Sequence, residues 1–226
     1  RDIHRAYLDA GADILETNTF NGTSIAMEDY AMTHLVRELN TAAVKVAREA
    51  VDAFKAANPG KDAFVAGAIG PTNKTLSMSR DVNDSAKRDV TFLQVRDSYR
   101  EQVDALIDAG ADLLLCETVF DTLVLKAALF AIDEAFEARG FRIPVMISGT
   151  ITDQSGRTLT GQTTEAFWNS VRHAQPISVG MNCALGGEQM RPHIAELAKK
   201  ADLFVSCYPN AGLPNPLSPT GFPEGP

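Results

Sequence analysis

The three cysteines of this chain are the first candidates for a chemical role, because a thiolate can act as a nucleophile or bind a metal ion. Cys183 ends a predicted strand, just before the turn Ala184-Leu185-Gly186-Gly187, where a thiol could reach a pocket or be a small buried residue. A single thiolate is not a zinc site, because tetrahedral sites need three or four ligands and the sequence has no Cys-x-x-Cys pair. Cys116 lies in an apolar run and is expected to pack in the core, whereas Cys207 could be a ligand or face the helices.

Two carboxylates could also do chemistry, because Glu16 and Glu117 each stand before a threonine at the end of a predicted strand. They could form an acid and base pair of the glycosidase type, if their separation suits it. Glu117 could equally hold the ammonium group of a substrate. The histidines all fall in predicted helices and are interpreted as ordinary helix residues: His4, His34, His173 and His193. No Ser-His-Asp arrangement emerges.

The elements that must position these residues alternate along the chain. Short runs rich in Val, Ile, Leu and Phe predict six strands, at Asp13–Phe20, Phe64–Pro71, Asp112–Val119, Pro144–Ile151, Ile177–Cys183 and Asp202–Tyr208. Between them the apolar positions recur with a helical period, as in the longer helix expected from Leu35 to Phe54. This alternation is typical of parallel βα units. Long polar loops at Thr72–Thr91 and Thr152–Thr163 are expected to shape a pocket.

A near-repeat supports a closed architecture, because Leu8–Thr17 resembles Ile107–Thr118. In each copy Ala-Gly-Ala-Asp is predicted to end a helix and to open a strand that finishes on Glu-Thr. The sequence therefore predicts an α/β fold, a (β/α)8 TIM barrel that is incomplete here. We expect its first and eighth strands to be absent, since the chain opens in a helix and six strands cannot close a barrel of eight. A doubly wound open sheet is the alternative, although no glycine-rich first turn is present to bind a nucleotide.

Composition narrows the class of protein further. The 226 residues are expected to form a single domain over positions 1–226. With 29 acidic and 21 basic side chains the net charge is −8, so nucleic acid is not an expected partner. No apolar stretch approaches the roughly 20 residues that span a bilayer, so no membrane is expected. Few cysteines and no secretory signal favour a reducing, cytoplasmic location.

Seven segments, in order along nearly the whole chain, closely resemble the cobalamin-dependent methionine synthases of the homocysteine S-methyltransferase family. These segments are Glu16–Asn21, Gly67–Asn73, Glu117–Leu123, Ser148–Asp153, Ser155–Leu159, Gly161–Phe167 and Pro209–Asn215. Specifically, the chain is similar to the N-terminal homocysteine-binding barrel of those modular enzymes. The resemblance implies that homocysteine is the substrate, and that cobalamin- and folate-binding modules of the same polypeptide are the partners.

The resemblance also implies a zinc ion held by three cysteines. Cys183, which follows Asn182, matches the first ligand, whereas the other two stand in a Gly-Gly-Cys-Cys run of the eighth strand, outside this chain. Cys116 and Cys207 do not match ligand positions. The homocysteine thiol would join the metal, lose its proton, and take a methyl group from methylcobalamin bound by another module. Methyltetrahydrofolate would restore that methyl group.

By the same resemblance, Glu117 is expected to bind the substrate ammonium, and the pocket to be shaped by Asn182, Ser148 and Thr150. One alternative is a stand-alone homocysteine S-methyltransferase using betaine or S-methylmethionine, although the Thr-Asn-Thr-Phe and Pro-Asn-Ala-Gly stretches favour the cobalamin enzymes. An alternative of another class is a non-catalytic fragment that binds weakly or scaffolds other modules. The chain by itself is expected to be inactive, because it has one of three zinc ligands.

Overall fold

The computed structural model describes residues 1–152 and 155–225 as a parallel sheet wrapped by helices. The strands are β1 (Ile14–Glu16), β2 (Phe64–Ile69), β3 (Leu113–Val119), β4 (Val145–Gly149), β5 (Ser178–Gly186) and β6 (Phe204–Asn210). The α-helices are α1 (Asp2–Asp9), α2 (Ser24–Met27), α3 (Val36–Ala57), α4 (Phe92–Asp108), α5 (Thr122–Arg139), α6 (Thr164–Val171) and α7 (Gly187–Lys200). Short 3-10 helices are η1 (Glu28–Tyr30), η2 (Thr33–Leu35) and η3 (Arg172–Ala174). None of the helices in this described part is long and apolar enough to cross a membrane.

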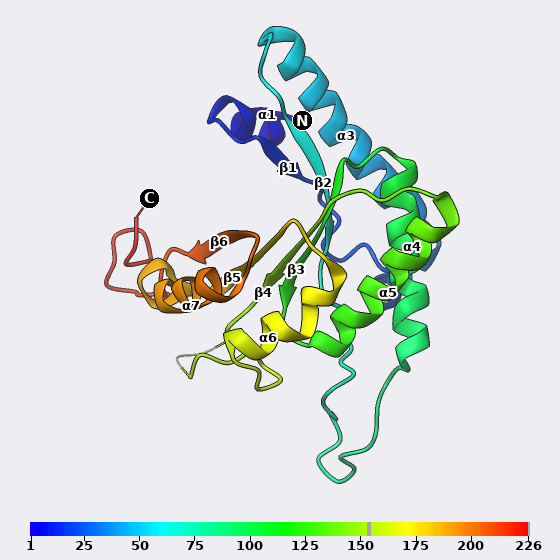
Figure 1. Ribbon diagram of the computed structural model, residues 1–226, viewed down its shortest axis with the longest axis vertical. Coiled ribbons are helices and arrows are strands. Elements are labelled where there is room, and N and C mark those ends of the chain that lie inside the picture. The colour runs from blue at the N-terminus through cyan, green and yellow to red at the C-terminus, as the bar shows by residue number, and fades with distance from the viewer. Residues whose placement is uncertain (153–154, 226) are drawn as a thin grey trace.

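The sheet follows the order of the chain. Each strand pairs in parallel with the next one in sequence, giving six strands in the order β1-β2-β3-β4-β5-β6. The sheet curls, and helices α3 to α7 lie around its outside (Figure 1). A doubly wound sheet would reverse its strand order at a switch point, and this sheet does not. The prediction of an incomplete TIM barrel is therefore confirmed.

All six predicted strands are present, but the first is shorter than the range Asp13–Phe20. Its ladder ends at Glu16 because threonine hydroxyls take over the pairing with β2. The Thr17 hydroxyl accepts a hydrogen bond from the Ala68 amide at 3.0 Å, and the Thr19 hydroxyl donates to the Ala68 carbonyl at 2.6 Å. A side-chain ladder cannot be recognised from hydrophobic pattern alone.

The repeated Ala-Gly-Ala-Asp segments end α1 and α4, as predicted. Gly11 and Gly110 have φ angles of +102° and +93°, a region that side chains with a Cβ rarely adopt. The amide of Ala12 then reaches back to the Tyr7 carbonyl at 3.0 Å, and the equivalent bond of the second copy is 3.1 Å. This geometry closes the helix end and turns the chain directly into the next strand.

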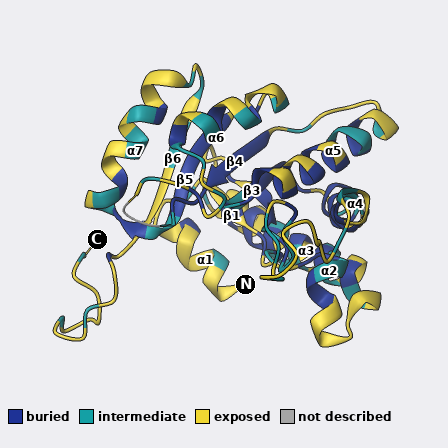
Figure 2. Cartoon of the chain, turned by 90° about the horizontal axis from the view of Figure 1, so that it is seen from below, coloured by how far each residue is buried: buried dark blue, intermediate teal, exposed yellow. Residues whose placement is uncertain are grey.

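Alternation along the strands separates two environments. The outward residues, including Val65, Leu114 and Ile147, are fully buried against the helices. Strands β3 and β4 are accordingly mostly dark blue in Figure 2. A second, smaller apolar cluster faces the barrel interior and consists of Ala66, Leu113, Leu115 and Met146. Further along the same inward face the residues become polar, at the carboxyl ends of the strands. The interior is therefore apolar at its floor and polar at its mouth.

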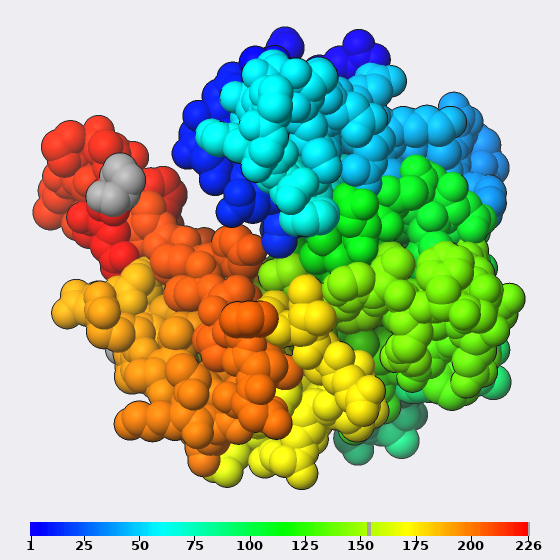
Figure 3. Space-filling view, turned by 45° about the horizontal axis from the view of Figure 1, so that its top comes forward, coloured from blue at the N-terminus to red at the C-terminus, as the bar shows by residue number. Residues whose placement is uncertain are grey.

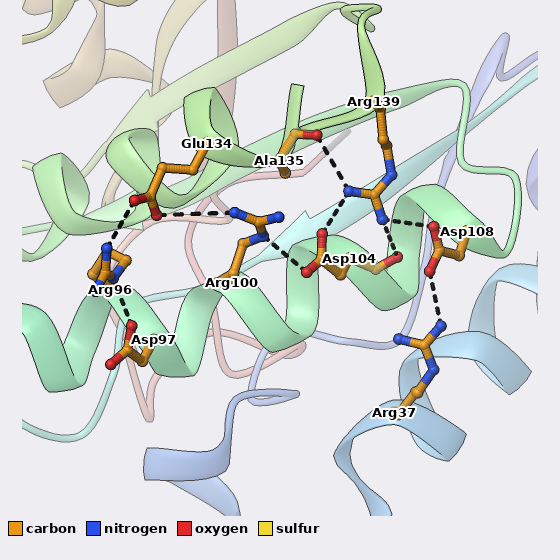
Figure 4. Close-up of polar contacts among 9 residues, drawn as sticks. All are labelled: Arg37, Arg96, Asp97, Arg100, Asp104, Asp108, Glu134, Ala135 and Arg139. Atoms are coloured by element: carbon orange, nitrogen blue, oxygen red, sulfur yellow. Dashed lines mark hydrogen bonds and ion pairs between the residues drawn. The ribbon is translucent and has the colours of Figure 1, made fainter. Parts of the chain in front are cut away.

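A ladder of ion pairs joins the outer helices α3, α4 and α5 (Figure 4). Arg139 of α5 binds Asp104 and Asp108 of α4, each at 2.6 Å. Asp104 also binds Arg100 at 2.8 Å, and Asp108 binds Arg37 of α3 at 2.8 Å. Each charge in this ladder has a partner on a neighbouring turn or helix, so the ladder fixes how these helices lie on the sheet.

Removing the centre of this ladder should destabilise the fold more than removing an isolated pair. Arg139→Met leaves two carboxylates of α4 without their shared partner, and we expect a loss of about 1–2 kcal/mol in the free energy of unfolding. Arg5→Met, which removes an exposed pair with Asp9, is the matched control and should cost less than about 0.5 kcal/mol. Urea denaturation measures both. Equal losses in the two variants would show that the ladder contributes no more than an ordinary surface pair.

Candidate active site

The side chain of Asn182 joins three strands at the mouth of the barrel. Its carbonyl oxygen accepts hydrogen bonds from the Ser148 hydroxyl at 2.7 Å and from the Thr118 amide at 3.1 Å. Its amide nitrogen donates to the Thr118 hydroxyl at 2.8 Å and to the Cys183 sulfur at 3.1 Å. Asn182 is only 4% exposed, so these bonds form away from bulk water. Three of the predicted site residues, Ser148, Asn182 and Cys183, therefore lie in direct contact.

Irregular backbone places the cysteine in this network. Thr118, Cys183 and Ala184 have φ angles of +57°, +62° and +59°, and the pairing register shifts at these points of β3 and β5. In a regular strand, neighbouring side chains point to opposite faces. The contact between Asn182 and Cys183 shows that the bulge brings the thiol to the same side as the amide. Left-handed conformations of such residues are costly and persist only where surrounding contacts hold them.

Two carboxyls and a phenol share the mouth. Burial raises the pKa of Glu117 to about 7, the nearby Glu16 carboxylate adds to the rise, and the Thr118 hydroxyl opposes it. Burial also raises the pKa of Glu16. The pKa of Tyr208 on β6 is raised by burial and by the charges of both glutamates. The charge of Glu16 therefore acts on Glu117, although strand β2 lies between β1 and β3.

A cavity of about 850 Å³ opens between α1, β1 and β6. Its walls include Glu16 and Tyr208, with Leu115 and Met146 on the apolar floor. Figure 3 shows this hollow between the N-terminal residues in blue and the C-terminal strand region in orange. His4 lies in a helix, as predicted, yet it lines this cavity, and burial is the largest cause lowering its pKa. The prediction that His4 lies in a helix did not indicate that its side chain lines a cavity.

The remaining predicted residues lie as follows. Thr150 follows β4 and is 6% exposed, and its hydroxyl has no hydrogen-bond partner within the described residues. Cys116 is a core residue, as expected, and burial raises the pKa of its thiol to about 12. Cys207 faces the helices, because its sulfur lies 3.3 Å from the Met190 sulfur of α7. Of the three cysteines, Cys183 is thus the one at the mouth.

The donor set for a metal is incomplete in this part of the chain. Within residues 1–152 and 155–225, no three His, Cys, Asp or Glu side chains lie close enough to hold a metal ion. Cys183 therefore supplies at most one ligand of a tetrahedral zinc site. Asp153, the last residue of one segment of the predicted resemblance, lies outside the described residues.

A buried carboxylate that the sequence analysis overlooked holds the rim together. Asp121 accepts hydrogen bonds from the Leu76 and Ser77 amides at 3.0 and 2.9 Å and from the Ser77 hydroxyl at 2.6 Å. It also caps α5 through the Leu123 amide at 2.9 Å. An aspartate directly before a predicted helix is an N-cap signal that could have revealed the second role. The long loop after β2 is thereby fixed beside the end of β3.

A parallel βα barrel with its polar groups gathered at the carboxyl ends of the strands defines the class of barrel enzymes that act at this face. The chain belongs to the homocysteine S-methyltransferase family, whose profile matches residues 1–222. The family predicted from the strand-end segments is thus confirmed.

Solved structures agree with this assignment. The metallated form of the homocysteine methyltransferase MmuM from Escherichia coli is similar with a TM-score of 0.77 and 25% identity, covering 93% of this chain and 71% of that one. Its oxidized form gives a TM-score of 0.75 at 25% identity, covering 94% and 70% of the two chains. Its apo form gives 0.70 at the same identity of 25%, covering 92% and 70%.

The raised pKa of Glu117 predicts a loss of stability as the pH rises. The folded chain holds this proton up to about pH 7, whereas the usual pKa is 4.5, so stability is present below the lower value and falls through the upper one. Allowing for solvent screening, we expect the wild type to lose on the order of 1–2 kcal/mol more than Glu117→Gln between these pH values. Denaturation at several pH values measures this, with the exposed Glu101→Gln as control. A wild-type profile identical to that of Glu117→Gln would contradict the shift.

Asn182 should be more important for stability than an ordinary asparagine. Asn182→Ala leaves the Ser148 hydroxyl and the Thr118 amide without their partner, and we expect a cost of about 2–3 kcal/mol. Asn169→Ala, at an exposed position of α6, should change stability by less than about 0.5 kcal/mol. Thermal unfolding compares them. If the two variants unfold alike, Asn182 does not hold the strand ends together.

Proposed function

We propose that this chain binds homocysteine at the mouth of the barrel and forms the homocysteine-binding part of a methionine synthase, with methylcobalamin as the methyl donor. The observation that carries the proposal is the Cys183 thiol, held by Asn182 at the end of β5 in a chain of this family. The Thr-Asn-Thr-Phe stretch at 17–20 and the Pro-Asn-Ala-Gly stretch at 209–212 favour the cobalamin enzymes. The first directly follows β1, and the second begins at the end of β6.

Each polar group of the mouth has a role in this proposal. Glu117 pairs with the substrate ammonium, which favours its ionised form and lowers its pKa from about 7. Asn182 and Ser148 hold the shape of the pocket through their mutual hydrogen bond. The buried hydroxyl of Thr150, which lacks a partner in the described structure, is available to a polar group of the substrate.

The reaction is a displacement at the methyl carbon. The homocysteine sulfur attacks as a thiolate, a sulfur–carbon bond forms, and the bond from carbon to the donor breaks with its electron pair remaining on the donor. The thiol proton leaves to solvent. Zinc, when bound, supplies the positive charge that keeps a thiol deprotonated at neutral pH. Cys183 would be one ligand, and the two adjacent cysteines of the family pattern lie outside this chain.

Two other functions remain candidates. A stand-alone homocysteine methyltransferase using betaine or S-methylmethionine as donor is supported by the similarity to MmuM over 93% of this chain. The isolated chain could also be a non-catalytic fragment, because its described residues supply no complete metal site. The methyl donor that is used distinguishes the methionine synthase from the stand-alone methyltransferase. Any methyltransferase activity distinguishes both from the non-catalytic fragment.

The decisive assay supplies homocysteine and zinc with methylcobalamin, S-methylmethionine or betaine and measures methionine by mass spectrometry. We expect little turnover from this chain alone, and methionine from methylcobalamin once a longer chain adds the two adjacent cysteines. In that longer chain Cys183→Ser should lower the rate by about 100-fold or more, because a zinc ligand is lost. Cys207→Ser, whose thiol faces α7, is the matched control and should retain activity.

Three results would contradict parts of the proposal. Methionine formed only from S-methylmethionine or betaine would establish the stand-alone enzyme. No methionine from any donor, even with the longer chain, would favour the non-catalytic fragment. Tight stoichiometric zinc on this chain alone would show that the two further cysteines are not required.

A further inference from the structure

We propose that Glu16 is a second carboxyl of the ammonium subsite, where it acts together with Glu117 to select thiols that carry an α-ammonium group. This inference rests on the proposed function, because that function makes homocysteine the ligand of the mouth. It adds Glu16 of β1 to the proposed ammonium subsite of Glu117 on β3, and it gives a physical basis for selecting the substrate.

The strand geometry brings the two carboxyls to one interior. On β1, Leu15 packs in the outer core, so Glu16 faces inward. On β3, Cys116 packs in the outer core, and Glu117 therefore faces inward as well. Glu16 also lines a cavity together with Leu115, and Glu117 is the next inward-facing residue of β3 after Leu115.

Charge points to a cation as the missing partner. Glu16 contributes to the raised pKa of Glu117, and both contribute to the raised pKa of Tyr208, so negative charge accumulates at one place. Glu117 is partly buried, and a second like charge near it is costly unless a proton or a cation neutralises one of them. Tyr208 contributes a hydroxyl to the same wall.

The basic groups on the cavity wall do not meet this need. Arg1, the residue before α1, forms an ion pair with Glu49 of α3. His4 has a pKa lowered by burial, which favours its neutral form. The thiol of Cys183 is engaged by Asn182, and Cys116 points into the outer core. Among the described residues that line the mouth, none is a cation free to pair with both glutamates.

Selection follows from this arrangement. Without ligand, burial favours the protonated form of Glu117 up to about neutral pH, and an arriving ammonium replaces that proton because it interacts with both carboxylates. Homocysteine binding should therefore release a proton to solvent. A thiol acid of the same length without an amino group brings only its carboxylate, which the two glutamates repel.

The test compares L-homocysteine with 4-mercaptobutanoate, which has the same thiol and carboxylate but no ammonium. NMR shift titrations of the full chain, with zinc present, give both dissociation constants. The wild type should prefer homocysteine, and Glu16→Gln should weaken homocysteine binding about tenfold while leaving 4-mercaptobutanoate unchanged or bound more tightly. Asp13→Asn removes an equal charge from an exposed residue just before β1 and should leave the preference unchanged.

A second measurement does not depend on any ligand. In carboxyl-labelled protein, Glu16→Gln should lower the pKa of Glu117 below its value of about 7, whereas Asp13→Asn should not. An unchanged Glu117 titration in Glu16→Gln overturns the inference. Equal weakening of both thiols, or of neither, overturns it too, while leaving homocysteine binding itself intact. Absence of binding by either thiol would instead contradict the proposed function, and this inference with it.

Discussion

The amide of Asn182 is the contact on which the mouth of this barrel depends. One planar group accepts from the ends of β3 and β4 and donates to both Thr118 and the Cys183 sulfur. Because both of its ends are used and water is excluded, it fixes the relative positions of three strand ends at once. The left-handed conformation at Cys183 persists because this network and the pairing of β5 with β6 constrain it.

The polarity gradient inside the barrel gives the mouth its electrostatic character. Apolar side chains such as Leu115 and Met146 form the floor of a cavity that Glu16 also lines, and Glu117 is the next inward-facing residue of β3 after Leu115. A carboxyl beside an apolar floor is poorly hydrated, which is the largest cause of the raised pKa of Glu117. On the outside, the ladder centred on Arg139 gives each charge an opposite partner, which offsets the cost of partly burying Arg139 and Asp104. Charged side chains therefore have raised pKa values inside the barrel, whereas outside they join the helices.

Much of the fold was predictable because its determinants are local. Hydrophobic period located all six strands, and Gly11 and Gly110 marked helix ends because only glycine adopts such φ angles readily. The buried placement of Cys116 followed from its apolar run. The early end of β1 could not be predicted, because it arises from a hydrogen bond between Thr17 and a residue 51 positions away along the chain. The hydrogen bond from the Ser77 amide to Asp121, 44 positions away along the chain, could not be predicted for the same reason.

The sequence by itself determined the alternation of strands and helices, the family, and the set of polar residues that end the strands. Only the tertiary structure decided which of these polar residues lie in contact with one another. It turned Cys207 toward Met190 and Cys183 toward Asn182, and it coupled Glu16 to Glu117 across β2. The physical reason is that side-chain direction in a regular strand follows from local period. A bulge, an interaction between two carboxyls and a cross-strand hydrogen bond depend instead on distances between segments that only the curled sheet brings together.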